Sequence, residues 1–196
     1  MRLISNKKRV ILRGVIFTTF NEFVENEFGY ETLDYILLQG EFPNDGGFCA
    51  GETYNPAVLV EMLQHLSAKT DIEMNSLWYK YGFYAFTSLV TQFREIYDDK
   101  ESPIFNDNVF DFVEQLNIMH FTELKKIYPN AQFPRFGIER EDDQITLIYS
   151  SEMKLHHFVK GLLSGCIHFF DEPLELSMTI NDDPQNTFSK FTIKRR

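Results

Sequence analysis

Cysteine is scarce in this chain of 196 residues, and tryptophan occurs only once. The two cysteines, Cys49 and Cys166, lie far apart in the sequence, and two thiols do not build a disulfide framework. We expect both thiols to be reduced, as is usual in the cytoplasm. No cysteine pair and no H-E-x-x-H motif has the spacing of zinc ligands, which argues against a zinc site.

Long hydrophobic runs are also missing. No stretch approaches the roughly 18 apolar residues that a membrane-spanning helix needs. Residues 1–12 mix basic and apolar side chains and lack the long apolar run of a signal sequence. We therefore expect a cytoplasmic protein without membrane insertion, in which residues 1–12 are an extension and residues 13–196 form one domain.

Basic residues are fewer than acidic ones. The chain has 19 Lys and Arg residues and 29 Asp and Glu residues, which gives a net charge of −10. Such a surface repels the phosphates of nucleic acids, so nucleic acid is not an expected partner. The sequence also lacks a Walker A loop, a dinucleotide-binding glycine motif and a G-x-S-x-G motif. These absences argue against nucleotide-binding and serine hydrolase functions.

Aromatic residues are abundant by contrast, with 20 Phe and 9 Tyr. A chain this rich in phenylalanine builds an interior lined by rings. That interior is either packed solid or encloses a large, flat, apolar ligand.

The apolar residues change their period along the chain. They follow the 3.6-residue helical period through residues 14–29, 31–38, 55–66, 70–97 and 109–128. After Pro134 the pattern predicts strands at 135–139 and 145–149, a helix at 154–170, and strands at 174–180 and 187–193. This order predicts an α+β fold, with a helical N-terminal subdomain followed by a four-stranded antiparallel sheet and a crossing helix (ββαββ).

One histidine interrupts the apolar stripe of the predicted helix 109–128. The stripe runs Val109, Val113, Leu116, His120, Leu124 and Ile127. A histidine in this position is either a core residue bonded to a backbone carbonyl or a metal ligand. Neutral imidazole can offer one nitrogen to a haem iron while the other nitrogen donates a hydrogen bond.

Five segments, in order, resemble the H-NOX (haem–nitric oxide/oxygen binding) family. They are RGVIFTTFNEFVENEFG at 13–29, AGETY at 50–54, LSAKT at 66–70, His120 with KKIYPNA at 125–131 and Pro134, and Tyr149 and Ser151 with GLL at 161–163. The resemblance favours the ligand interpretation of His120.

The resemblance implies a role for several residues on the proximal side of a haem b. His120 would be the axial ligand of the iron, Pro134 would press against the haem and distort it, and Tyr149 and Ser151 would bind the propionates. The family motif Tyr-x-Ser-x-Arg has Met153 at the arginine position here. Arg can clamp a carboxylate with two charge-assisted hydrogen bonds, whereas Met has no donor. Lys154 and Arg135 are nearby cations that could take its place.

The distal side is implied to be apolar. Family members that bind oxygen carry a distal tyrosine, and Phe158 occupies that position here. Ile16, Phe20 and Leu162 would complete the pocket. Such a pocket suits NO and CO and disfavours a stable complex with O₂.

The resemblance implies a haem-based gas sensor and not an enzyme. The haem would lie between a helical distal part, residues 13–70, and a proximal part, residues 71–196. NO binding opposite His120 would weaken the iron–histidine bond, release the helix and signal to a separate histidine kinase or cyclic-dinucleotide enzyme. The alternative, motivated by Met153, is a haem-free interaction or redox-responsive module. A peroxidase-type enzyme is disfavoured, because it needs distal acid–base residues.

Overall fold

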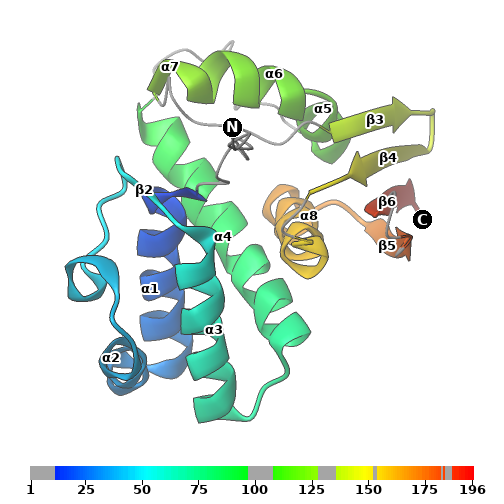
Figure 1. The fold of residues 1–196 in the computed structure, drawn as a ribbon. Helices are drawn as coiled ribbons and strands as arrows, with labels where there is room; N and C mark the ends of the chain where they lie inside the picture. The colour runs from blue at the N-terminus through cyan, green and yellow to red at the C-terminus, as the bar shows by residue number, and fades with distance from the viewer. Residues whose placement is uncertain (1–11, 97–107, 128–135, 152–153, 182, 184–186) are drawn as a thin grey trace, which may run out of the picture.

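The N-terminal half of the molecule is a group of four helices. The structure, a computed structural model, describes residues 12–96, 108–127, 136–151, 154–181, 183 and 187–196. The four helices are α1 (Gly14–Phe28), α2 (Tyr30–Gln39), α3 (Pro56–Thr70) and α4 (Met74–Ile96). A short 3-10 helix, η1 (Pro43–Gly46), lies in the glycine-rich loop between α2 and α3. Figure 1 shows α1, α3 and α4 side by side.

Local sequence signals set the ends of these helices. The side chain of Asn55 accepts a hydrogen bond from the backbone N–H of Ala57 at 3.0 Å, and Pro56 occupies the first helical position of α3. Gly29 separates α1 from α2 with a φ of 87°, a conformation that glycine adopts without steric cost. The predicted helices at 14–29, 31–38 and 55–66 therefore form within a few residues of their expected bounds.

The start of the described chain is held by a small two-stranded sheet. Strand β1 (Leu12–Arg13) pairs antiparallel with β2 (Thr53–Tyr54), and Leu12 lies opposite Tyr54. The Arg13 guanidinium also donates a hydrogen bond to the backbone carbonyl of Gly51. Leu12, which we expected to belong to an extension, thus takes part in the fold.

The C-terminal half is a four-stranded antiparallel sheet with a helix beside it. The strands are β3 (Phe136–Arg140), β4 (Gln144–Tyr149), β5 (Leu174–Asn181) and β6 (Phe188–Arg195), in the order β3-β4-β6-β5. Helix α8 (His156–Phe170) connects β4 to β5 and lies between α4 and the strands in Figure 1. The predicted α+β fold with a ββαββ order is confirmed.

Alternating side chains of the two central strands enter the core. Leu147 on β4 lies opposite Phe191 on β6, and Ile145 lies opposite Ile193. All four are buried. These cross-strand apolar pairs determine which face of the sheet packs against α8 and α4.

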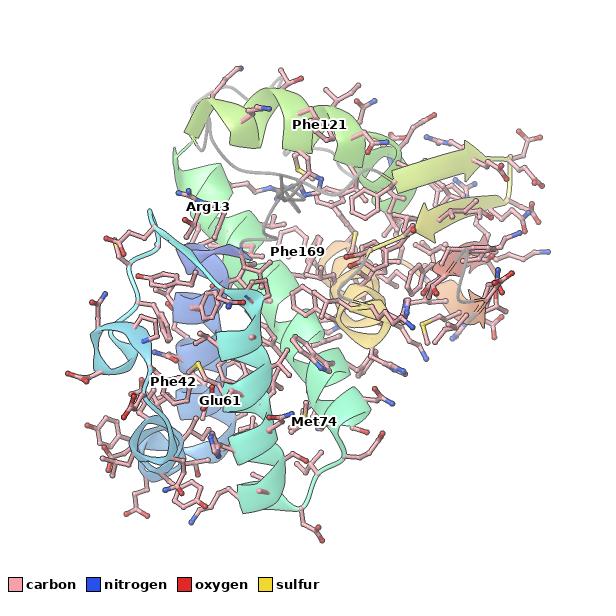
Figure 2. All side chains as sticks on the ribbon, viewed as in Figure 1. Arg13, Phe42, Glu61, Met74, Phe121 and Phe169 are labelled. Atoms are coloured by element: carbon pink, nitrogen blue, oxygen red, sulfur yellow. The ribbon has the colours of Figure 1, made fainter. Side chains whose placement is uncertain are left out.

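Helix α4 passes through two hydrophobic cores. The first core lies among α1–α4 and contains Phe17, Phe20 and Tyr81. The second lies between the end of α4, residues 109–119, the sheet and α8, and contains Phe86, Phe112 and Phe191. Side chains fill both regions in Figure 2.

Glycines allow α4 and α8 to approach each other closely. A Cβ atom built on Gly82 of α4 would overlap the carbonyl oxygen of Phe158 of α8. In the same way, a Cβ on Gly161 would overlap the carbonyl oxygen of Tyr79. The two backbones are therefore in direct contact, and α8 joins the helical group to the sheet.

The helix expected at residues 109–128 is helical but not one continuous α-helix. It consists of α5 (Val109–Glu114), α6 (Leu116–Ile118), the π-helix η3 (Met119–Leu124) and α7 (Lys125–Ile127). Gln115 interrupts it with φ −86° and ψ −2°. The expectation of regular α-helix is wrong, because wider i→i+5 turns replace α-helical turns around His120.

The contact between α4 and α8 predicts that Gly82→Ala is destabilising. Alanine gains roughly 1 kcal/mol of helix propensity over glycine. Overlap with a backbone oxygen costs about 3 kcal/mol, the upper part of the overpacking range. We expect a net loss of about 2 kcal/mol, which lowers the Tm of a chain of this size by several degrees in a thermal melt.

Gly51→Ala is the matched control, because a Cβ on Gly51 meets no atom within 4 Å. A Gly82→Ala protein that melts at or above the temperature of the Gly51→Ala protein would contradict the direct backbone contact.

Candidate functional site

An apolar cavity lies inside the second core. It has a volume of about 150 Å³ and is lined by α4, α8, β3, β4 and the segment from Phe112 to His120. Of the thirteen side chains that line it, only those of His120 and Cys166 carry a hydrogen-bond donor. The cavity therefore offers one nitrogen base in a surrounding of hydrocarbon and ring surface.

His120 is neutral in this cavity at physiological pH. Burial lowers its pKa to about 4, because a charged imidazolium is poorly solvated there, and a hydrogen bond with the Leu116 backbone opposes this effect in part. Its ring lies 5.6 Å from the ring of Phe136 on β3, centroid to centroid. A neutral imidazole has the free electron pair that a metal ligand needs.

Tyr149 and Ser151 lie together at the end of β4. Burial raises the pKa of Tyr149, while hydrogen bonds with the Ser151 side chain and the Leu155 backbone oppose the rise. The Tyr149 ring is 6.1 Å from that of Phe136, so Phe136 connects Tyr149 to His120. Of the other proximal residues, Pro134, Arg135 and Met153 fall outside the described residues, and Lys154 is exposed.

All four expected distal residues pack in or against the first core, and Leu162 also packs against the second. The Phe20 ring lies 5.2 Å from that of Tyr81, and the Tyr81 ring lies 5.1 Å from that of Phe158. The Tyr81 hydroxyl donates a hydrogen bond to the backbone carbonyl of Ile16. Of the four, only Leu162 lines the cavity that holds His120.

Helix α4 supplies the cavity wall that the sequence reasoning did not assign. Phe86, Leu89 and Val90 line the cavity from this helix. Their apolar spacing was visible as part of the stripe of the predicted helix 70–97. The stripe alone does not say which core each turn of α4 faces.

Cys166 and His156 are two further buried polar groups near this region. Burial raises the pKa of the Cys166 thiol well above its usual value, so it stays protonated. His156, at the start of α8, is buried and shares a hydrogen bond with Ser189 of β6. His156 is thus a core histidine outside the cavity lining, whereas His120, which is hydrogen-bonded to the Leu116 backbone, lines the cavity.

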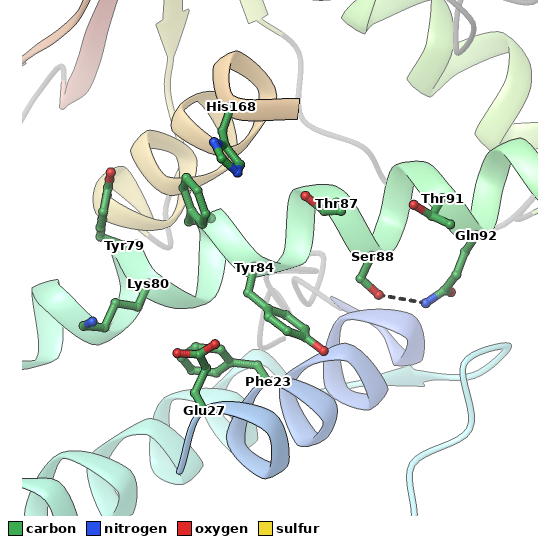
Figure 3. Close-up of a pocket in the computed structure, with 11 residues that line it drawn as sticks. Phe23, Glu27, Tyr79, Lys80, Tyr84, Thr87, Ser88, Thr91, Gln92 and His168 are labelled. Carbon is green, nitrogen blue, oxygen red and sulfur yellow. Dashed lines mark hydrogen bonds between the residues drawn. The ribbon is translucent and has the colours of Figure 1, made fainter. Parts of the chain in front are cut away.

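A larger groove lies on another side of α4, as Figure 3 shows. Its volume is about 830 Å³, and its walls combine aromatic rings with hydroxyl, amide and charged groups from α1, α4 and α8. Its one imidazole belongs to His168, which is exposed. Within the described ranges, no three His, Cys, Asp or Glu side chains gather as a metal site.

None of the described helices combines the length and the apolar character that crossing a membrane requires.

Comparison with known proteins places the chain in a family. The sequence profile of the Haem-NO-binding (HNOB) family matches residues 13–178. No curated protein sequence matches the chain.

Solved structures of similar fold are H-NOX proteins. The unliganded Fe(II) H-NOX protein of K. algicida is 28% identical, with a TM-score of 0.77 over 94% of this chain and 97% of that one. The H-NOX of Shewanella woodyi, solved in the Fe(II)CO state, is 29% identical, with a TM-score of 0.74 over 94% and 95%.

An H-NOX protein of S. oneidensis in the Fe(II)NO state has a TM-score of 0.82 over 94% of this chain and 99% of that one. At 19% identity, it supports the fold alone. Because the family profile spans most of the sequence, and the fold and the apolar cavity agree with it, this chain belongs to the H-NOX family of haem-based gas sensors.

Proposed function

We propose that this protein senses NO, and also binds CO, at a ferrous haem b whose proximal ligand is His120. The observation that carries the proposal is a neutral, buried imidazole in a cavity whose other lining side chains are almost all apolar. The match to the Haem-NO-binding family and the S. woodyi structure, solved with CO, support gaseous ligands of this kind. When bound, haem supplies the iron atom at which the gas coordinates.

The chemistry of the cavity fits a porphyrin. Aromatic and aliphatic side chains from α4, α8 and β4 provide flat apolar contact, and His120 provides the nitrogen ligand. The cavity of about 150 Å³ is smaller than the roughly 300–1,000 Å³ typical of sites for drug-sized ligands. The side chains of α4 and α8 must therefore separate from the His120 segment to admit the ring.

Tyr149 and Ser151 are the proposed partners of the haem propionates. Their hydroxyls are within hydrogen-bonding distance of each other, and Tyr149 is packed against the ring that contacts His120. The two hydroxyls can thus donate to one carboxylate. Pro134 is the proposed contact that distorts the haem.

The cavity also favours discrimination against O₂. Bound O₂ depends on a hydrogen-bond donor near the iron more than NO or CO does. Besides His120, the donor in the cavity lining is the Cys166 thiol, which is a weak donor. The phenol of Tyr81 donates to the Ile16 carbonyl, and Phe158 has no donor.

Signal output is proposed to start at the segment that carries His120. This segment leads directly into α7, where Lys125 and Lys126 are exposed. A change in the position of His120 would therefore alter the surface presented by α7. A separate histidine kinase or cyclic-dinucleotide enzyme would read that surface.

The first test replaces the proposed ligand. We expect His120→Gly protein, expressed with haem supply, to lose most of its haem absorption in the visible spectrum. Adding imidazole during expression should restore the absorption, because free imidazole can occupy the space of the missing side chain.

His157→Gly is the control, since His157 also lies on a helix near the sheet but outside the cavity lining. If His120→Gly retains haem with an unaltered spectrum without imidazole, His120 is not the ligand. A colourless wild-type protein would instead support the haem-free interaction module.

The second test concerns the choice of gas. We expect the ferrous protein to give stable spectra with NO and with CO, but no lasting oxy spectrum in air, because the cavity lacks a strong donor. Leu162→Tyr brings a phenol to the cavity wall and should slow the loss of an oxy complex. A stable oxy spectrum of the wild-type protein would refute the proposed apolar ligand pocket.

A further inference from the structure

Asn117 holds the His120 segment against the edge of the sheet. Its side-chain Nδ2 donates a hydrogen bond to the carbonyl oxygen of Phe136 at 2.8 Å. The backbone N–H of Phe136 donates to its Oδ1 at 3.0 Å. The carboxamide of Asn117 therefore satisfies both backbone groups of one residue.

The position of Phe136 makes these two hydrogen bonds specific. Strand β3 is an edge strand that pairs only with β4 within the described sheet. In an antiparallel strand, the N–H and C=O groups of one residue point to the same side. Those of Phe136 point to the open edge, where the Asn117 side chain takes the place of a neighbouring strand.

The ring of Phe136 also packs near two proposed haem-binding residues, His120 and Tyr149. The Phe136 ring lies 5.6 Å from that of His120 and 6.1 Å from that of Tyr149. It also lines the cavity. Asn117 precedes His120 by three residues, so the two lie on neighbouring positions of one helical turn.

We infer that Asn117 is a positioning residue for the sensor site. Its two hydrogen bonds to Phe136 fix the distance between the His120 segment and β3, and so fix where the imidazole presents its nitrogen to the haem iron. This inference rests on the proposed function. Without the two bonds, the π-helical segment around His120 has one less anchor on the sheet, and the imidazole can take a range of positions.

Two further sets of contacts hold the start of this segment. Arg140 of β3 forms ion pairs with Asp111 and Glu114 of α5, both at 2.6 Å. The Glu172 carboxylate accepts a hydrogen bond from the Val109 N–H at 2.5 Å. These contacts keep α5 in place when Asn117 is replaced, so the effect of a substitution should be confined to the His120 region.

The first measurement is hydrogen exchange at the Phe136 amide, followed by NMR on the protein as purified. In Asn117→Ala we expect this amide to exchange about tenfold faster, the effect of losing one typical hydrogen bond. Asn117→Asp keeps an acceptor for the Phe136 N–H and should retain most of the protection. Amides of the central strand β4 are internal controls and should not change.

The second measurement is the iron–histidine stretching band of the ferrous protein in resonance Raman spectra. We expect Asn117→Ala to shift and broaden this band, and Asn117→Asp to give a smaller shift. Asn26→Ala is the matched control. It removes an exposed asparagine hydrogen bond to Tyr84, at 2.6 Å, between α1 and α4, and should leave the band unchanged.

The outcomes separate this inference from the proposed function. A wild-type protein without haem absorption would overturn both. A haem-loaded Asn117→Ala protein with an unchanged iron–histidine band would overturn the positioning role alone, and an unchanged exchange rate at Phe136 would do the same. If Asn117→Ala does not fold, Asn117→Asp tests the role through the iron–histidine band, because its carboxylate cannot donate to the Phe136 carbonyl. An unshifted band in Asn117→Asp would then overturn the positioning role.

Discussion

The contact between the backbones of α4 and α8 is the constraint on which the molecule depends. Gly82 and Gly161 leave no room for a side chain where the two helices cross. This crossing joins the helical group to the sheet, because α4 belongs to both cores and α8 packs beside the strands. It also brings Leu162 and Phe86 to the same cavity, so the cavity exists because the crossing is close.

The apolar cavity determines the protonation state of the His120 imidazole that lines it. A charged imidazolium there would lose its hydration, so the ring remains neutral. Neutrality keeps an electron pair available for a metal. The same apolar surroundings that suit a porphyrin therefore also maintain its proposed ligand in the form that can bind iron.

The segment that carries His120 is anchored unevenly. Its beginning, α5, is held by the ion pairs of Arg140 and by Glu172, whereas the part nearer His120 is tied to β3 through Asn117. π-Helical turns are rare and often occur at functional sites. A segment held at its beginning and irregular at the proposed ligand is suited to convert a small displacement into a change at α7.

The sequence by itself determined the fold class, because the change of apolar period after Pro134 is a local property of the chain. It also singled out His120, since a histidine within an apolar stripe is visible without a structure. Only the tertiary structure decided that Ile16, Phe20 and Phe158 lie in the first core, that α4 lines the cavity, and that Asn117 bonds to Phe136. Helical periodicity shows that a side chain is buried, but the partner it meets depends on how distant elements pack, and that packing is a property of the whole chain.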